Sequence, residues 1–235
     1  MNRFSLRVRS FIIALACSAF ALNMGAQIGR LPTPEELQTK ANLQNLYLSS
    51  PGAAKPNHLL ITGPEQDCDN AIPVCQQTYS QPNSYTGHGT LQEVNGTCLM
   101  IQESNSVWYV FTVQNSGTFT FLLNTANDYD FALYDITTIG CTGVPSATPV
   151  RCNYSGTYGS TGLTLPTQAG NLSYNASQSP TMPGINVTAG QTFVLIIDNF
   201  SNNSNGYTLT FGGSAQIYDV TPPSVTSYSL PCSAN

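Results

Sequence analysis

Residues 105–135 read NSVWYVFTVQNSGTFTFLLNTANDYDFALYD, and this stretch decides the fold class. Aromatic and β-branched residues recur there at every second position in three short segments: 107–113, 118–123 and 129–134. A two-residue period is typical of β-strands, because successive side chains of a strand point to opposite faces. Turn-forming residues lie between the segments: Asn115-Ser116-Gly117 and Asn127-Asp128. The stretch therefore predicts three short strands joined by tight connections.

The same pattern continues through residues 67–218, which we interpret as one domain. Further strand candidates lie at 71–79, 84–94, 149–152, 162–165, 185–187, 192–198 and 207–211. About 150 residues can bury a substantial single core, and many short strands between Gly, Asn and Pro turns favour two packed sheets. We predict an all-β fold, an antiparallel and jelly-roll-like β-sandwich, preceded by a signal peptide and a short helix.

The segment 192–198 is predicted to be a central strand. Its residues are apolar almost without interruption, as expected where both faces of a sheet are covered. The two faces should carry different side chains: Phe193, Leu195 and Ile197 on one, and Val194, Ile196 and Asp198 on the other.

The first 26 residues have the pattern of a secretory signal peptide. Three arginines precede an apolar run at 11–22, and Gly25-Ala26 offers a cleavage site. The run is shorter than the roughly 20 apolar residues of a membrane-spanning helix. We therefore predict a secreted or cell-surface protein without membrane insertion after cleavage. An alternative is lipid attachment at Cys17, which follows Ala14-Leu15-Ala16.

Residues 27–66 are interpreted as a leader. Thr33-Pro34-Glu35-Glu36 has the sequence of a helix capping box, and Ser49-Ser50-Pro51-Gly52 ends the helical pattern. A helix of three to four turns is expected, followed by a linker. It is either a pro-segment or docking helix, or a short helix that rests on the following domain, and we favour the second.

Residues 219–235 are interpreted as a linker and the first strand of a further, truncated domain. Asp219 and the prolines at 222 and 223 suit a stiff linker, and residues 225–230 have strand character. A single strand cannot bury itself. On this interpretation Cys232 lacks its natural partner.

Signal removal leaves six cysteines, an even number that favours disulfides in an exported chain. They are Cys68, Cys75, Cys98, Cys141, Cys152 and Cys232. We expect Cys141 to pair with Cys152 and Cys75 with Cys98, while the partners of the other two stay open.

The charge of the chain argues against polyanionic partners. Signal removal takes three of seven basic residues and none of twelve acidic ones, so the mature chain has a net charge of −8. Between Asp67 and Tyr218 the only basic residue is Arg151. Nucleic acids and anionic membranes both require cationic surfaces. We therefore expect neither as a partner.

Motifs for catalysis are weak, and we predict that the chain is not an enzyme. His88 lies in a turn-like Gly-His-Gly segment, and no G-x-S-x-G element occurs. Glu93 and Glu103 flank Cys98, but nothing in the sequence places them across a cleft as glycoside hydrolysis requires.

The best site candidate is acidic. Calcium is bound by six to eight oxygen ligands, and carboxylates are frequent among them. Asp128 and Asp130 share one face of a strand by alternation, Asp135 follows, and Asp198 ends another apolar strand. We predict these four as candidate calcium ligands, with turn capping as the competing interpretation.

Aromatic residues in loop-like segments suggest a second kind of site. They are Tyr79, Tyr85, Tyr154, Tyr158 and Tyr174. Such rings either form a platform for sugars or anchor loops by burying the ring while the hydroxyl stays wet.

Five motifs carry a family resemblance. In chain order they are Cys68-Asp-Asn-Ala71-Ile-Pro73-Val-Cys75, Asn105-Ser-Val-Trp108-Tyr-Val-Phe111, Asp130-Phe-Ala-Leu-Tyr-Asp135, Leu195-Ile-Ile-Asp198-Asn-Phe200 and Gly206-Tyr-Thr-Leu-Thr-Phe211. The set resembles the β-sandwich module of gliding motility-associated surface proteins of Bacteroidota. It is also similar to bacterial pre-peptidase C-terminal domains. The type IX sorting domain with which many such surface proteins end is absent from this sequence.

Two functions follow from the resemblance. The first is a non-enzymatic, adhesin-like extracellular module with polysaccharide or surface proteins as partners. The second is an accessory domain of a secreted hydrolase, of the pre-peptidase C-terminal or carbohydrate-binding kind.

Overall fold

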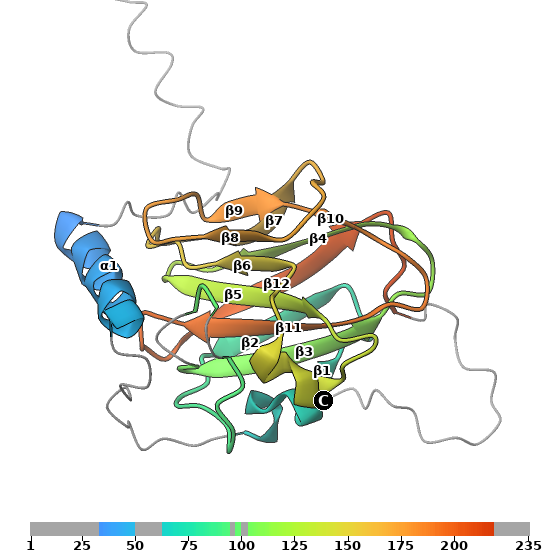
Figure 1. The fold of residues 1–235 in the computed structure, drawn as a ribbon, viewed down its shortest axis with the longest axis horizontal. Coiled ribbons are helices and arrows are strands. Elements are labelled where there is room, and N and C mark those ends of the chain that lie inside the picture. Colours follow the sequence, from blue (N-terminus) through green and yellow to red (C-terminus); the bar gives the residue numbers. More distant parts are fainter. Residues whose placement is uncertain (1–32, 50–62, 95–96, 100–102, 219–235) are drawn as a thin grey trace, which may run out of the picture.

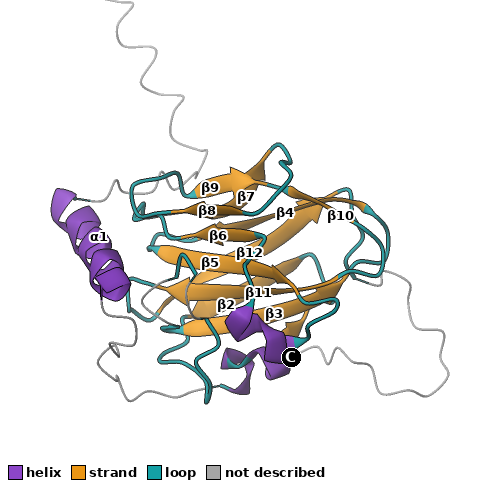
Figure 2. Ribbon diagram, viewed as in Figure 1, coloured by secondary structure: helices purple, strands orange, loops and turns teal. Residues whose placement is uncertain are grey.

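The computed structural model of the chain describes residues 33–49, 63–94, 97–99 and 103–218. The predicted signal peptide, the predicted tail with Cys232, and most of the linker after the helix lie outside the described residues. Within them, twelve strands form two stacked sheets, with one helix at their edge (Figures 1 and 2). The predicted all-β sandwich is confirmed.

The first sheet has six strands in the order β1-β3-β11-β5-β6-β8. Their bounds are Ile72–Pro73 (β1), Ser106–Thr112 (β3), Thr192–Asn199 (β11), Tyr129–Asp135 (β5), Arg151–Asn153 (β6) and Leu172–Tyr174 (β8). Strand β11 lies in the middle and pairs antiparallel with β3 and β5 over its whole length. The prediction of a central strand at 192–198 is confirmed.

The second sheet is built around β4 and β12. It contains β2 (Thr78–Asn83), β12 (Asn205–Gly213), β4 (Gly117–Asn124), β7 (Thr161–Leu165) and β9 (Thr181–Pro183), with β10 (Ile185–Val187) also paired to β4. Three edge pairings are parallel: β1 with β3, β6 with β8, and β7 with β9. The sheets are therefore mixed, and the expectation of purely antiparallel pairing is wrong at these edges. The partners in each parallel pair are separated by longer segments that return the chain in the same direction.

The core between the sheets follows the predicted alternation. Phe193, Leu195 and Ile197 of β11 belong to it, together with the odd-numbered residues of β3. Phe111 stacks on Phe119 across the sheets with ring centroids 4.6 Å apart. These side chains are buried, and burial of aromatic and aliphatic area is the main source of stability for such a sandwich.

The outer face of the first sheet is also covered. Trp108, Tyr134, Val194 and Ile196 form a second apolar cluster with residues of the connecting segments. Three short 3₁₀ helices lie in these segments: η1 (Pro64–Gln66), η2 (Cys68–Asn70) and η3 (Cys141–Ser146). A sheet covered on both faces explains why β11 is apolar almost throughout.

Two disulfides fasten this cover, and both differ from the expected pairs. Cys68 bonds Cys141, and Cys98 bonds Cys152. The expectation of Cys141–Cys152 and Cys75–Cys98 pairs is therefore wrong; Cys75 is disulfide-bonded as well. The expected pairs are close in sequence, whereas the fold brings together cysteines 73 and 54 residues apart.

The segment 84–94 is a loop, which corrects the strand predicted there. Side chains satisfy its backbone in place of a strand partner: the Asp67 carboxylate accepts hydrogen bonds from the amides of Thr90 and Leu91 at 3.1 and 3.0 Å. The candidate at 71–79 contains only β1 and the start of β2. Strands β8 and β9 were not predicted.

Helix α1 (Pro34–Ser49) confirms the predicted leader helix. The Thr33 hydroxyl accepts from the Glu36 amide at 3.2 Å, and the Glu36 carboxylate accepts from the Thr33 amide at 2.7 Å. This reciprocal pair is the predicted capping box. The helix stands beside one end of the sandwich, next to β5 and β11 (Figure 1). In the described part of the chain, no helix is long and apolar enough to cross a membrane.

Candidate functional site

Three of the four predicted acidic residues converge on the outer face of the first sheet. Tyr129 and Phe131 point into the core between the sheets, so Asp130 points outward, and Asp128 lies just before β5 on the same side. Strand register places Asp198 of β11 directly opposite Asp130. Asp135 lies at the far end of β5, where its carboxylate accepts from the Thr137 amide and the Gln191 side chain. Strand alternation thus correctly predicts the shared face of Asp128, Asp130 and Asp198. It does not predict that Asp135 lies apart from them.

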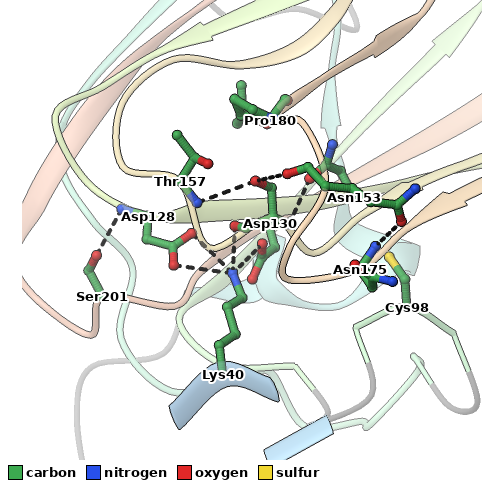
Figure 3. Close-up of polar contacts among 12 residues, drawn as sticks. Lys40, Cys98, Asp128, Asp130, Asn153, Thr157, Asn175, Pro180 and Ser201 are labelled. Atoms are coloured by element: carbon green, nitrogen blue, oxygen red, sulfur yellow. Dashed lines mark hydrogen bonds and ion pairs between the residues drawn. The ribbon is translucent and has the colours of Figure 1, made fainter. Parts of the chain in front are cut away.

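The group that occupies this acidic face is Lys40 of α1. Its Nζ lies 2.7 Å from Oδ1 of Asp130, and 3.0 and 3.2 Å from the two carboxylate oxygens of Asp128 (Figure 3). The relative exposure of Lys40 and Asp130 is 0%, and that of Asp128 is 2%. Lys40 therefore makes two buried ion pairs. It extends from a helix beside one end of the sandwich to the outer face of the first sheet.

Backbone and aromatic groups complete the enclosure, which we call the Lys40 pocket: Asp128, Asp130, Tyr154, Ser155 and Phe200. The Ser155 carbonyl accepts a hydrogen bond from Nζ at 2.9 Å. Nζ also lies 4.2 Å from the ring centroid of Tyr154 and 4.4 Å from that of Phe200. Ring faces attract ammonium groups, most strongly where water is excluded. The pocket is thus shaped for a primary amine.

Loops at the strand ends hold the pocket in place. The Ser201 hydroxyl accepts a hydrogen bond from the Asp128 amide at 2.8 Å, and the Ser201 amide donates to the Asp128 carbonyl at 3.2 Å. On the other side, the Asn153 side chain accepts from the Ser155 amide at 2.8 Å. These contacts orient the Asp128 backbone and the Ser155 carbonyl, so the site is pre-organised before Lys40 enters.

Burial dominates the electrostatics of the pocket. It raises the pKa of Asp128 to about 6, although the Lys40 charge acts to lower it. It raises the pKa of Asp130 well above its usual range, and the neighbouring Asp128 and Asp198 charges add to that rise. One ammonium can neutralise only one carboxylate, so the pocket favours a proton on the second. The proton belongs mainly to Asp130, the more deeply buried acid.

Calcium binding requires the same space. The Lys40 ammonium lies between the two carboxylates, where a cation bound by both would sit. In the described ranges, no group of three or more His, Cys, Asp or Glu residues is arranged to hold a metal ion. Calcium at Asp128 and Asp130 stays a prediction, and only for a state in which Lys40 has left.

The other sequence candidates lie elsewhere and are largely structural. Glu93 and Glu103 are both buried, and Oε1 of Glu103 accepts from the Glu93 amide at 3.3 Å, so they do not line an open cleft. Burial raises the pKa of both carboxyls. The His88 ring contacts the Gly89 carbonyl. Of the five tyrosines considered for sugar stacking, Tyr154 is fully buried and the rest are half-buried.

Arg151 is the second buried cation of the described chain. Its guanidinium donates to five backbone carbonyls: those of Val150, Gln168, Gly170, Pro183 and Gly184. Burial lowers its pKa. Because four of these acceptors, all except Val150, come from the segment between β7 and β10, Arg151 has the role of fastening that segment to β6.

Comparison with known proteins adds no identity. No family model, curated protein or solved structure matches this chain. The class that the structure defines is therefore a disulfide-bonded all-β sandwich with a lysine from an N-terminal helix buried in its outer face.

Sequence reasoning missed Lys40, although one signal was present. After residue 26 the sequence has only four Lys and Arg residues, and one of them lies in the middle of a helix with a well-formed N-cap. In a chain with so few cations, each is a candidate partner for buried carboxylates.

Proposed function

We propose that the chain is a non-enzymatic extracellular module of an adhesin-like surface protein. In this module the Lys40 pocket holds the N-terminal helix against the sandwich. The observation that carries the proposal is the burial of Lys40 between Asp128 and Asp130. A catalytic or sugar-binding site has to admit its substrate, whereas this cluster is closed by the chain itself.

Three further observations support an extracellular structural role. The two disulfides suit an oxidising compartment. The described surface carries few charges, because both cations discussed above are buried. The resemblance to gliding motility-associated modules points in the same direction, with polysaccharide or surface proteins as the expected partners.

The anchoring role is tested by comparing Lys40→Met with the full chain and with Gln38→Met. Gln38 is exposed on the same helix, so its replacement leaves the pocket intact. We expect hydrogen exchange at the α1 amides to rise at least about tenfold in Lys40→Met only, because undocked helices of this length are marginal in water. Equal protection of α1 in all three proteins would refute the anchoring role.

The adhesive role needs a separate test. Beads coated with the full chain should bind polysaccharide- or protein-coated surfaces, and protease added to intact producing cells should degrade the chain. Hydrolysis of the bound polysaccharide or protein by the purified chain would overturn the non-enzymatic assignment. A catalytic domain encoded in the same reading frame would favour the accessory-domain function instead.

A further inference from the structure

The Lys40 pocket places an amine against two carboxyl groups with different contacts. Both oxygens of Asp128 lie close to Nζ, at 3.0 and 3.2 Å, as in a bidentate ion pair. Asp130 contacts Nζ through Oδ1 alone, at 2.7 Å. Its Oδ2 is buried and has no hydrogen-bond partner among the described residues. Asp130 is therefore the carboxyl group whose second oxygen is not needed for the ion pair.

We propose that Lys40 Nζ and Asp130 Cγ join in an intramolecular isopeptide bond, with Asp128 as the group that carries the proton. The inference rests on the proposed function, because it makes covalent the same contact that holds α1 on the sandwich. It adds a modification site and a self-catalysed reaction to that contact.

The reaction balances without a co-reactant. In the starting state Asp130 holds a proton, and the Asp128 carboxylate takes one proton from the Lys40 ammonium, which leaves a neutral amine beside a carboxylic acid. The amine nitrogen attacks Cγ of Asp130, and Asp128 gives its proton to the departing hydroxyl group. Asp128 then accepts the proton that the nitrogen releases and ends as a carboxylic acid. One N–C bond forms, one C–O bond breaks, and one water molecule leaves.

The surroundings favour both the neutral reactants and the product. Burial raises the pKa of Asp130 well above its usual range, so this residue readily holds the proton that turns its hydroxyl into a leaving group. The rings of Tyr154 and Phe200 flank Nζ and exclude water that would hydrolyse intermediates. Amine and acid held in contact react with effective concentrations far above those in solution. The amide also removes an ammonium and a carboxylate from the interior, where both are costly.

The test is the intact mass of the full chain, purified after export, reduced and denatured. We expect the chain to weigh one water molecule less than its Lys40→Arg variant after correction for the substitution. Signal cleavage and disulfides affect both proteins equally, and a guanidinium at position 40 keeps the charge but forms no such amide. Peptide mapping should find one branched peptide that joins Lys40 to Asp130. In Asp128→Asn the bond should form about a hundredfold more slowly, and Asp128→Glu should restore part of the rate.

Three outcomes would overturn the proposal: no loss of water relative to Lys40→Arg, a loss that persists in Lys40→Arg, or a bridge from Lys40 to Asp128. Variants that do not fold are recognised by their circular dichroism and do not affect the mass of the unsubstituted chain. If its mass is unmodified while Lys40→Met still releases α1, only the covalent step fails. If Lys40→Met leaves α1 protected, the anchoring role fails with it.

Discussion

Replacing Lys40 with methionine should weaken the fold in a way that depends on pH. Methionine matches the aliphatic length of lysine without the ammonium, so the substitution removes charge and leaves little cavity. Asp128 and Asp130 would then be buried at 2% and 0% exposure without a cation. Removal of one partner from a buried ion pair costs about 3–5 kcal/mol. The loss of stability in Lys40→Met cannot exceed the free energy with which α1 docks. Once the helix has undocked, water reaches both carboxyls and their burial no longer costs free energy.

The pH dependence follows from the direction of the pKa shifts. Both carboxyls have raised pKa values in the folded chain, that of Asp128 to about 6, and Lys40 acts to lower them. Without Lys40 the folded variant binds more protons than the unfolded chain at every pH between the unfolded and folded pKa values. Its stability therefore rises as the pH falls through that window and is lowest above it. We expect the destabilisation to be smaller by about 1–2 kcal/mol at pH 5 than at pH 7.5.

The single tryptophan makes the measurement direct. Trp108 is fully buried in the cluster on the outer face of the first sheet, the face that carries the Lys40 pocket. Its fluorescence in urea titrations at the two pH values gives the free energy of unfolding, with Gln38→Met as the control. A loss below about 1 kcal/mol at pH 7.5, or one that is equal at both pH values, would refute the reasoning.

Three further predictions follow from the same structure. Arg151→Lys should lower the free energy of unfolding by about 2–4 kcal/mol, because an ammonium cannot satisfy five carbonyls in the fork geometry; urea titration measures the loss. The double variant Cys98→Ser, Cys152→Ser should lower it by about 2–4 kcal/mol, because the bond closes a loop of 54 residues; thermal unfolding detects this. Millimolar calcium should raise the melting temperature of Lys40→Met but not that of the unsubstituted chain, because only the variant leaves the carboxylates without a cation.

Each of these predictions has an opposing result. An Arg151→Lys variant as stable as the parent would mean that the carbonyls are satisfied by other groups. An unchanged melting temperature in the serine variant would mean that the cover of the outer face is held by packing alone. A chelator that lowers the melting temperature of the unsubstituted chain would support the calcium site and contradict the placement of Lys40.

The parts of this structure that local patterns encode were predictable. Alternation in residues 105–135 specified β3, β4 and β5 and their inward faces, and Thr33 with Glu36 specified where α1 begins. Alternation also placed Asp128 and Asp130 on one face. These features depend on contacts within a few residues, where sequence and conformation are directly linked.

The parts that failed depend on partners chosen over long distances. Lys40 reaches carboxylates 88 and 90 residues away, and no local pattern records that pairing. The same holds for the cysteine pairs and for the parallel edges of the sheets. Residues 84–94 were expected to form a strand, yet they form a loop in which the Asp67 carboxylate satisfies part of the backbone. Tertiary contacts override a short pattern in such cases.

The long sequence separation between Lys40 and its acceptors also determines when α1 can dock during folding. The pocket is assembled from β5, the loop after β6 and the loop after β11, so it does not exist until most of the domain has been made. Helix α1 is synthesised before every strand of the sandwich, and Lys40 reaches its native contacts only when Phe200 is in place. Closure of long loops is slow and comes late. Helix α1 is thus made before the sandwich but can dock only after the pocket residues of the sandwich have come together.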